Sequence, residues 1–262
     1  MKRQTAKDKK GNPVEATTPE TAAPAAAVPQ GLPALYNQVA FLNGGVHGKL
    51  HYLQQTDFKF AAEANYIPLT VMEFADAASF YPIVFAGSGD NLEPVAILGR
   101  GKGENQFVGA DGKWRDATYI PAYVRRHPFI LISDTGNTSV SLGVDLTAAN
   151  IKETSEGEAL YADGKPTDTA KRALQFCLAY QQAALASTAV CKAIEQAGLL
   201  IDRSAEFKLP SGNSRVTGFK IIDETVFNQL SDEKFLELRK AGALPVIYAH
   251  LLSMKAWRNL VV

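Results

Sequence analysis

The sequence contains only two cysteines, and their spacing excludes a disulfide between them. Cys177 and Cys191 both fall in a segment that predicts one continuous helix. Fourteen residues separate them, which corresponds to about 21 Å at a helical rise of about 1.5 Å per residue. A disulfide requires Cα atoms within about 7 Å of each other. We therefore expect two buried thiols that behave as small apolar residues in a reduced compartment.

Residues that could ligate a metal are also scarce. The sequence has four histidines, of which His47 and His51 lie four residues apart. Glycines surround this pair and favour a turn and a strand over the helix that would present both rings to a metal. His250 falls on the packing face of the predicted last helix, where a hydrogen-bonded core histidine is expected. The sequence predicts neither a metal site nor a cofactor.

An excess of one charge and long apolar runs are missing as well. The chain has 27 Lys and Arg residues and 27 Asp and Glu residues. This balance argues against a general nucleic-acid binder and against attachment to an anionic membrane by charge. No apolar run approaches the roughly 20 residues that span a bilayer. The Ala- and Pro-rich start does not form a signal-peptide core, so we predict a cytoplasmic protein.

Two glycine-rich segments, 87–89 and 99–103, lack the context of a nucleotide-binding loop. Neither opens a helix directly after a strand, as phosphate-binding loops do. Ser88 between two glycines is only part of a nucleophile elbow. Both segments predict turns between strands, and no catalytic group is predicted.

Composition divides the chain into parts. Residues 1–30 are rich in Lys, Thr, Ala, Pro and Glu and predict a disordered tail. Residues 31–262 predict a single domain that is β-rich over 35–150 and helix-rich over 165–262. The predicted fold class is α+β, with a mostly antiparallel β-sheet that contains an inserted short helix. A helical C-terminal part with one hairpin follows the sheet.

Local patterns predict the individual elements. Thr70 and Glu73 have capping-box spacing and begin a helix that should end before Pro82. The pair Gly44-Gly45 predicts a hairpin. The other predicted elements are buried strands at 83–87 and 94–99, a hairpin at Asp111-Gly112, a strand at 140–146, a helix from Asp168 to Ala197, a hairpin across 211–213, and closing helices at 231–241 and 244–260.

An aromatic and basic cluster is the best candidate for a binding site. It comprises Tyr119, Tyr123, Arg125, Arg126 and His127. On an extended chain alternate side chains share a face, which would group Tyr123, Arg125 and His127. Paired arginines beside aromatic rings suit a carboxylate, a phosphate or the acidic loop of a partner. The alternative is a structural role, in which the arginines neutralise carboxylates inside the fold.

Four segments of the chain resemble the bacterial SapC family. They are IPLTVMEFADAASFYPIVFAG, PVAILG, ENQFVGADGKWRDATYIPAYVRRHPF and LPSGNSRVTGFKIID, and the similarity runs from about Val39 to the C-terminus. The family is named for an association with the bacterial surface layer. Its genes tend to occur beside halogenase-like and TonB-dependent-receptor genes. The resemblance implies an accessory role at the cell surface or in metabolite handling or import, with no established catalytic residues.

Three hypotheses about function follow from these observations. The first is a non-enzymatic accessory protein that binds another protein through an exposed apolar patch near 119–129 or the last helix. The alternative is a protein or enzyme that binds a small carboxylate or phosphate ligand where Arg125 or Arg126 meets a tyrosine, with Asp90 or Asp145 nearby. A structural subunit of the surface layer is a third hypothesis, which requires export and self-assembly.

Overall fold

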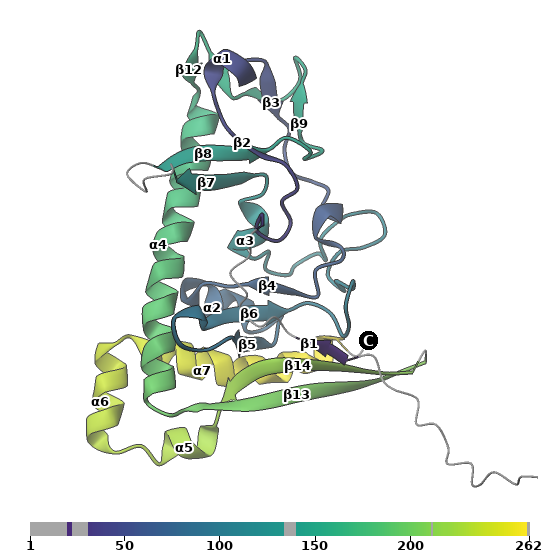
Figure 1. The fold of residues 1–262 in the computed structure, drawn as a ribbon. Helices are drawn as coiled ribbons and strands as arrows, with labels where there is room; N and C mark the ends of the chain where they lie inside the picture. The colour runs from purple at the N-terminus through teal and green to yellow at the C-terminus, as the bar shows by residue number, and fades with distance from the viewer. Residues whose placement is uncertain (1–19, 23–30, 134–139, 211, 261–262) are drawn as a thin grey trace, which may run out of the picture.

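The chain adopts the predicted α+β fold, arranged as two parts that one long helix joins (Figure 1). The computed structural model describes residues 20–22, 31–133, 140–210 and 212–260. The tail predicted over residues 1–30 lies outside the described residues except for residues 20–22, which form a short strand. The larger part contains most of the apolar core, and the smaller part has a core of its own.

The larger part is built on a six-stranded sheet. Its strands are β1 (Glu20–Ala22), β4 (Tyr66–Pro68), β5 (Ile83–Ala86), β6 (Glu93–Ile97), β13 (Leu200–Leu209) and β14 (Gly212–Ile222). The order is β1-β14-β5-β6-β4, with β13 also paired to β14. The pairs are antiparallel except for β1 with β14. Every residue of β5 is buried, as its continuous apolar run predicts.

The smaller part consists of short sheets. They are β2 (Val39–Phe41), β8 (Val140–Asp145) and β7 (Phe129–Ser133), then β10 (Glu158–Ala159), β3 (Leu50–Tyr52) and β9 (Ile151–Glu153), and finally β11 (Tyr161–Ala162) with β12 (Lys165–Pro166). The hairpin predicted at Gly44-Gly45 is wrong, because residues Gly44–His47 form helix α1. The Asn43 side chain caps this helix by accepting the Gly45 N–H at 2.8 Å. As a result, β2 and β3 pair with distant strands and not with each other.

Helix α4 (Asp168–Gln196) runs along both parts and confirms the predicted long helix (Figure 1). The Thr167 hydroxyl caps its first turn by accepting the Ala170 N–H, and Gly198 follows its end with a φ of +74° that suits glycine. Cys177 is buried in the core of the smaller part, and Cys191 in that of the larger part. Both are free thiols. Helix α4 therefore contributes side chains to both apolar cores.

The helix predicted at Thr70 is also present, and its capping box is complete. The Glu73 carboxylate accepts both the Thr70 N–H and the Thr70 hydroxyl, at 2.9 and 2.8 Å. A 3-10 turn, η2 (Val71–Glu73), begins there and continues into α2 (Phe74–Ala77). The helix ends before Pro82, as the restriction on residues preceding proline requires.

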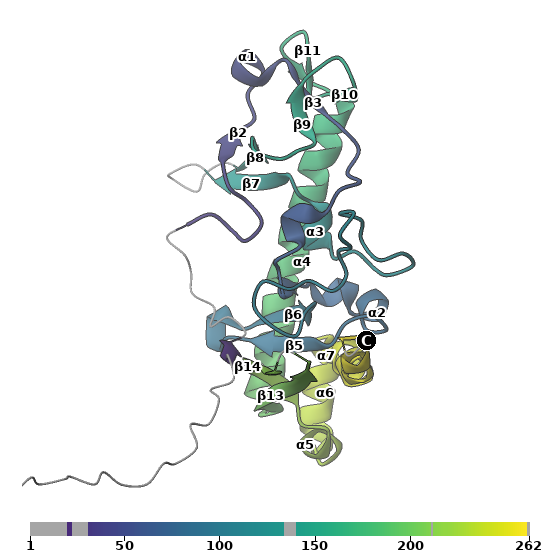
Figure 2. The same cartoon turned by 90° about the vertical axis from the view of Figure 1, so that its right-hand side faces the viewer.

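The C-terminal region contains the predicted hairpin and the two predicted helices, together with a short helix, α5, that was not predicted. The hairpin is formed by β13 and β14, and Ser211 near its tip lies outside the described residues. The helices are α5 (Glu224–Asn228), α6 (Asp232–Lys240) and α7 (Ala243–Ser253). The last predicted helix is shorter than expected, because α-helical geometry ends at Ser253 and residues 254–260 form a 3-10 helix. In Figure 2, α7 lies next to β5 and β14, which it contacts.

A histidine of α7 completes the large sheet where two strands separate. β14 and β5 pair directly over two residue pairs, and the same register would bring Ile222 opposite Ile83. At that position the His250 ring joins the strands: Nε2 accepts the Ile222 N–H at 3.0 Å, and Nδ1 donates to the Ile83 carbonyl at 2.8 Å. The Ser253 hydroxyl accepts the Ile83 N–H at 3.1 Å. Side chains of α7 thus form the hydrogen bonds with Ile222 and Ile83 that a neighbouring strand would otherwise form.

These contacts require a neutral imidazole. The Ile222 N–H is directed at Nε2, so the single ring proton belongs on Nδ1, which faces the Ile83 carbonyl. Burial lowers the pKa of His250 to about 4, against the opposing effect of that carbonyl. His250 is therefore the hydrogen-bonded core histidine that the sequence predicts.

We expect His250→Leu to lower the free energy of unfolding by about 2–5 kcal/mol, because it leaves a buried N–H and a buried carbonyl without partners. The measurement is urea unfolding monitored by circular dichroism at pH 7. His51→Leu is the matched control, since the partly exposed His51 ring hydrogen-bonds, among the described residues, only the nearby Lys49 carbonyl; its effect should stay within about 0.5 kcal/mol. Equal effects of the two substitutions would contradict the structural role of His250.

Candidate functional site

The aromatic and basic cluster lies between the two parts of the fold, beside α4 (Figure 2). Residues Ala122–Arg125 form helix α3, so the extended conformation expected for this segment is wrong. Pro121 is the N-cap residue of this helix, and its carbonyl accepts the Arg125 N–H at 3.0 Å. Helical neighbours are rotated by about 100°. Consequently Tyr123, Arg125 and His127 do not share one face.

A buried carboxylate positions the start of α3. Oε1 of Glu73 accepts the Ala122 N–H at 2.6 Å and the Tyr119 hydroxyl at 2.9 Å. Its other oxygen remains in the capping box with Thr70. The Tyr119 hydroxyl also accepts a hydrogen bond from the Arg125 guanidinium at 3.0 Å. Burial and the neighbouring Glu73 raise the pKa of Tyr119 to about 12, which keeps the phenol protonated between the two charges.

Arg126 is enclosed by three tyrosine rings. Its guanidinium carbon lies 4.3 Å from the centroid of Tyr123, 4.5 Å from that of Tyr180 and 5.5 Å from that of Tyr36. The ring faces attract the cation. Its Nε is buried without a hydrogen-bond partner. Among the described residues, neither Arg126 nor Arg125 forms an ion pair with a carboxylate.

A pocket of about 260 Å³ opens beside these arginines, and we call it the arginine pocket. It is lined by Tyr52, Arg125, Arg126, Phe129, Glu158, Thr169, Arg172, Ala173 and Phe176. Arg172 pairs with Glu158 at 2.8 Å, and the Thr169 hydroxyl donates to the same carboxylate. The Arg125 guanidinium lies over the Phe176 ring at 5.5 Å. Three guanidinium groups therefore surround a space that contains one carboxylate.

Sequence reasoning did not identify the α4 and β10 residues of this pocket. Glu158, Arg172 and Phe176 lie more than thirty residues after the cluster in the chain. Arg172 and Phe176 are four residues apart, so one face of a helix presents both. That spacing is the signal in the sequence that could have grouped Arg172 with Phe176. The sequence does not show, however, that this face of α4 packs near α3.

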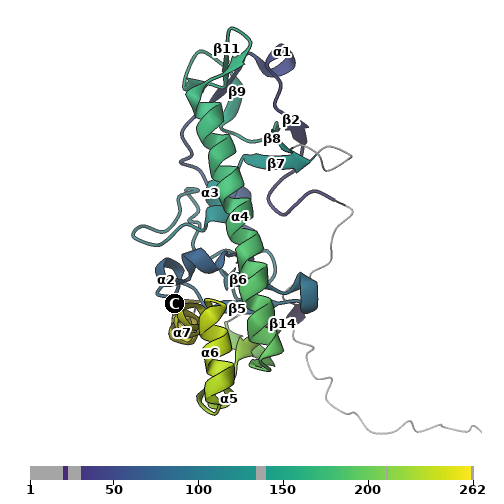
Figure 3. The ribbon, with the colours of Figure 1, turned by 90° about the vertical axis from the view of Figure 1, so that its left-hand side faces the viewer.

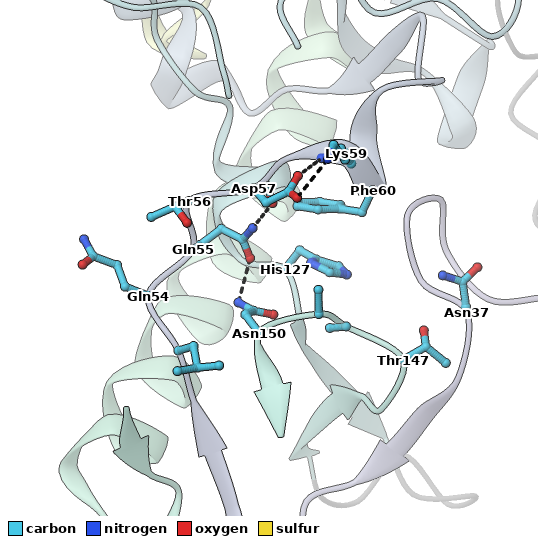
Figure 4. Close-up of a pocket in the computed structure, with 13 residues that line it drawn as sticks. Asn37, Gln54, Gln55, Thr56, Asp57, Lys59, Phe60, His127, Thr147 and Asn150 are labelled. Atoms are coloured by element: carbon cyan, nitrogen blue, oxygen red, sulfur yellow. Dashed lines mark hydrogen bonds and ion pairs between the residues drawn. The ribbon is translucent and has the colours of Figure 1, made fainter. Parts of the chain in front are cut away.

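His127 lines a different cavity, of about 330 Å³ (Figure 4). Several of the residues that line the cavity carry amide or hydroxyl side chains, namely Asn37, Gln54, Gln55, Thr56, Thr147 and Asn150. The imidazole stacks on the Phe60 ring with centroids 3.9 Å apart and planes at 16°. Its Nδ1 is buried without a hydrogen-bond partner. The structure thus separates His127 from the two arginines that precede it.

The two aspartates expected near the arginines lie elsewhere. Asp145 is fully buried with Oδ2 4.0 Å from Nε2 of His127, and it accepts the Asn37 N–H and the Thr147 hydroxyl, each at 2.7 Å. Burial opposes the charge of Asp145, but its hydrogen bonds outweigh burial and lower its pKa. Asp90 pairs with Lys192 at 3.0 Å on the surface. Neither aspartate compensates the charge of Arg126.

Comparisons with known proteins identify one family. A family model described as SapC matches residues 42–260 of the chain. No curated protein and no solved structure matches. Over the described part of the chain, no helix has the length and apolar character needed to cross a membrane, and no three His, Cys, Asp or Glu side chains are grouped closely enough to hold a metal ion.

The free energy of unfolding should fall as the pH drops from about 6.5 to about 4. Burial lowers the pKa of His127 to about 4, with Asp145 opposing this effect and Arg126 adding to it. An unfolded chain binds the proton near pH 6.5, so acid favours unfolding in this window. Complete protonation costs on the order of 3 kcal/mol for such a shift. Urea unfolding of the wild type at several pH values measures the decline.

His127→Gln is the informative variant for this pH dependence. It should reduce the difference in unfolding free energy between pH 7 and pH 4, because one of the two buried neutral histidines is then absent. An NMR titration of the His127 ring provides an independent measurement. A pKa near 6.5 for that ring, or an unchanged pH dependence in the variant, would contradict the assignment.

Proposed function

The chain belongs to the SapC family, and on this premise we propose that it is a non-enzymatic accessory protein that binds another protein. The role implied by the family, at the bacterial surface layer or in metabolite handling or import, forms part of this proposal. We also propose a cytoplasmic location, which favours the role in metabolite handling or import over the role at the surface layer. The main support is the outer face of α4, the side that Figure 3 presents to the viewer.

The outer face of α4 lacks charge over most of its length. No Asp, Glu, Lys or Arg occurs between Arg172 and Lys192, although many side chains in this stretch are exposed. The exposed side chains are Gln175, Ala179, Gln181, Gln182, Leu185, Ala186 and Ala189. Exposed helix faces of soluble proteins usually carry charged residues. Depletion of charge is the compositional feature of the centre of a protein–protein interface.

Two large apolar side chains strengthen this interpretation. Leu185 is 66% exposed and Met72 is 73% exposed. Met72 adjoins α4, because the N–H of the preceding Val71 donates to the Ser187 hydroxyl at 2.8 Å. A flexible methionine beside an uncharged helix suits a surface that binds a partner. We call Met72 and the exposed residues of α4 the α4 face.

The regions expected from sequence to carry an apolar patch differ from the α4 face. Tyr123 of the aromatic and basic cluster is buried. The last helix does expose Tyr248 and Leu252, one turn apart. Leu252 therefore offers a second apolar position of similar exposure, at 60%, against which the α4 face can be tested.

Leu185→Glu should weaken partner binding at least tenfold without changing the melting temperature, because it places a charge in the centre of the α4 face. The measurement is affinity capture from separate fractions of the native host, followed by mass spectrometry and quantification of the partner retained by each variant. Leu252→Glu is the matched control and should retain the partner. Loss of the partner with Leu252→Glu alone would place the interface on α7, and no specific partner for the wild type would refute the proposal.

A further inference from the structure

Arg126 carries a partly buried charge that no neighbouring carboxylate neutralises among the described residues. An arginine side chain stays ionised in proteins, and buried charges are normally paired with an opposite charge. Here the guanidinium is surrounded by the rings of Tyr36, Tyr123 and Tyr180, and its Nε has no hydrogen-bond partner. Ring faces attract a cation but supply no negative charge. The place where an anion can approach Arg126 is the arginine pocket, which the side chain lines.

The remaining charges of the arginine pocket also favour an anion. Arg125 donates to the Ile120 carbonyl at 2.9 Å and to the Tyr119 hydroxyl at 3.0 Å, both uncharged acceptors. Arg172 has a carboxylate partner in Glu158. Thr169 lies in the first turn of α4, and the positive end of a helix dipole favours anions. Three arginines against one glutamate leave the pocket positive.

Glu158 shows how a carboxylate fits in this pocket. Its carboxylate accepts a hydrogen bond from Arg172 at 2.8 Å and another from the Thr169 hydroxyl. Both members of the ion pair are more than half exposed, and exposed ion pairs are weak. A ligand carboxylate can therefore replace Glu158 at Arg172, or can bind Arg125 and Arg126 while Glu158 stays in place. In either case the charge of Glu158 opposes the binding of an anion.

Most of the uncharged residues that line the pocket are aromatic. Tyr52 and Phe129 pack together with ring centroids 5.5 Å apart, and Phe176 lies under the Arg125 guanidinium. Binding sites of this kind combine an apolar body with a few polar groups that orient the ligand. Aromatic rings attract each other in offset or edge-to-face arrangements. A volume of about 260 Å³ limits the occupant to a small molecule.

We propose that the arginine pocket binds a small aromatic carboxylate. The carboxylate lies against Arg125 and Arg126, the ring packs among Tyr52, Phe129 and Phe176, and Glu158 competes with the ligand for the positive charge. Arginine suits this role because its planar group can donate two parallel hydrogen bonds to a carboxylate. This inference is independent of protein binding at the α4 face.

The first experiment compares benzoate with benzamide, its uncharged analogue of similar shape, by titration into the full-length protein followed by NMR. Benzoate should bind saturably and at least tenfold more tightly than benzamide, and its affinity should fall with added salt. Inorganic phosphate should bind more weakly than benzoate, because it has no ring. Equal binding of benzoate and benzamide would overturn the proposal. Tighter binding of phosphate would also overturn it, in favour of an inorganic-anion site.

Variants test the individual residues. Glu158→Gln should bind benzoate several-fold more tightly, an increase that a purely structural role would not produce. Arg125→Gln should bind it at least tenfold more weakly, whereas Arg239→Gln, at an exposed arginine on α6 outside the pocket, should bind as the wild type does. Unchanged affinity in both pocket variants would overturn the proposal. Leu185→Glu should bind benzoate normally, so failure at the α4 face is distinguishable from failure at the pocket.

Discussion

The insertion of His250 between β14 and β5 is the interaction on which the larger part of the fold depends. The two strands share a short direct pairing and then separate, so the backbone groups of Ile222 and Ile83 need other partners inside the core. One neutral imidazole bonds to both, and Ser253 takes the remaining N–H of Ile83. Because both side chains belong to α7, the same contacts that complete the sheet also fix the helix against it.

Helix α4 connects the large sheet to both the arginine pocket and the α4 face. Its inner side enters both cores, through Cys191 in the larger part and Cys177 in the smaller part. Its N-terminal turns contribute Arg172 and Phe176 to the arginine pocket, and its outer side forms the uncharged α4 face. A single rigid helix is able to do this because it is long, about 43 Å for 29 residues. The pocket and the face are thus held in a constant relative position.

Arg126 and His127 are adjacent in the sequence, but their basic side chains have different charge states in the fold. Arg126 remains charged among tyrosine rings, because a guanidinium does not lose its proton at accessible pH. His127 is buried against Phe60, and burial makes it neutral. The cluster could be recognised from sequence by its composition, but its division into two cavities could not. That division follows from the helical conformation of α3, which rotates consecutive side chains away from each other.

The sequence by itself determined the elements whose signals are local. The capping box at Thr70, the glycine stop at Gly198 and the apolar runs of β5 and β6 all act within a few residues, so their outcome can be read from the chain. Only the tertiary structure decided which distant groups meet. It placed Glu158 and Arg172 beside Arg125, and His250 between two strands, because those contacts depend on how whole helices pack against sheets. Packing of this kind is cooperative over the entire core, and no short segment encodes it.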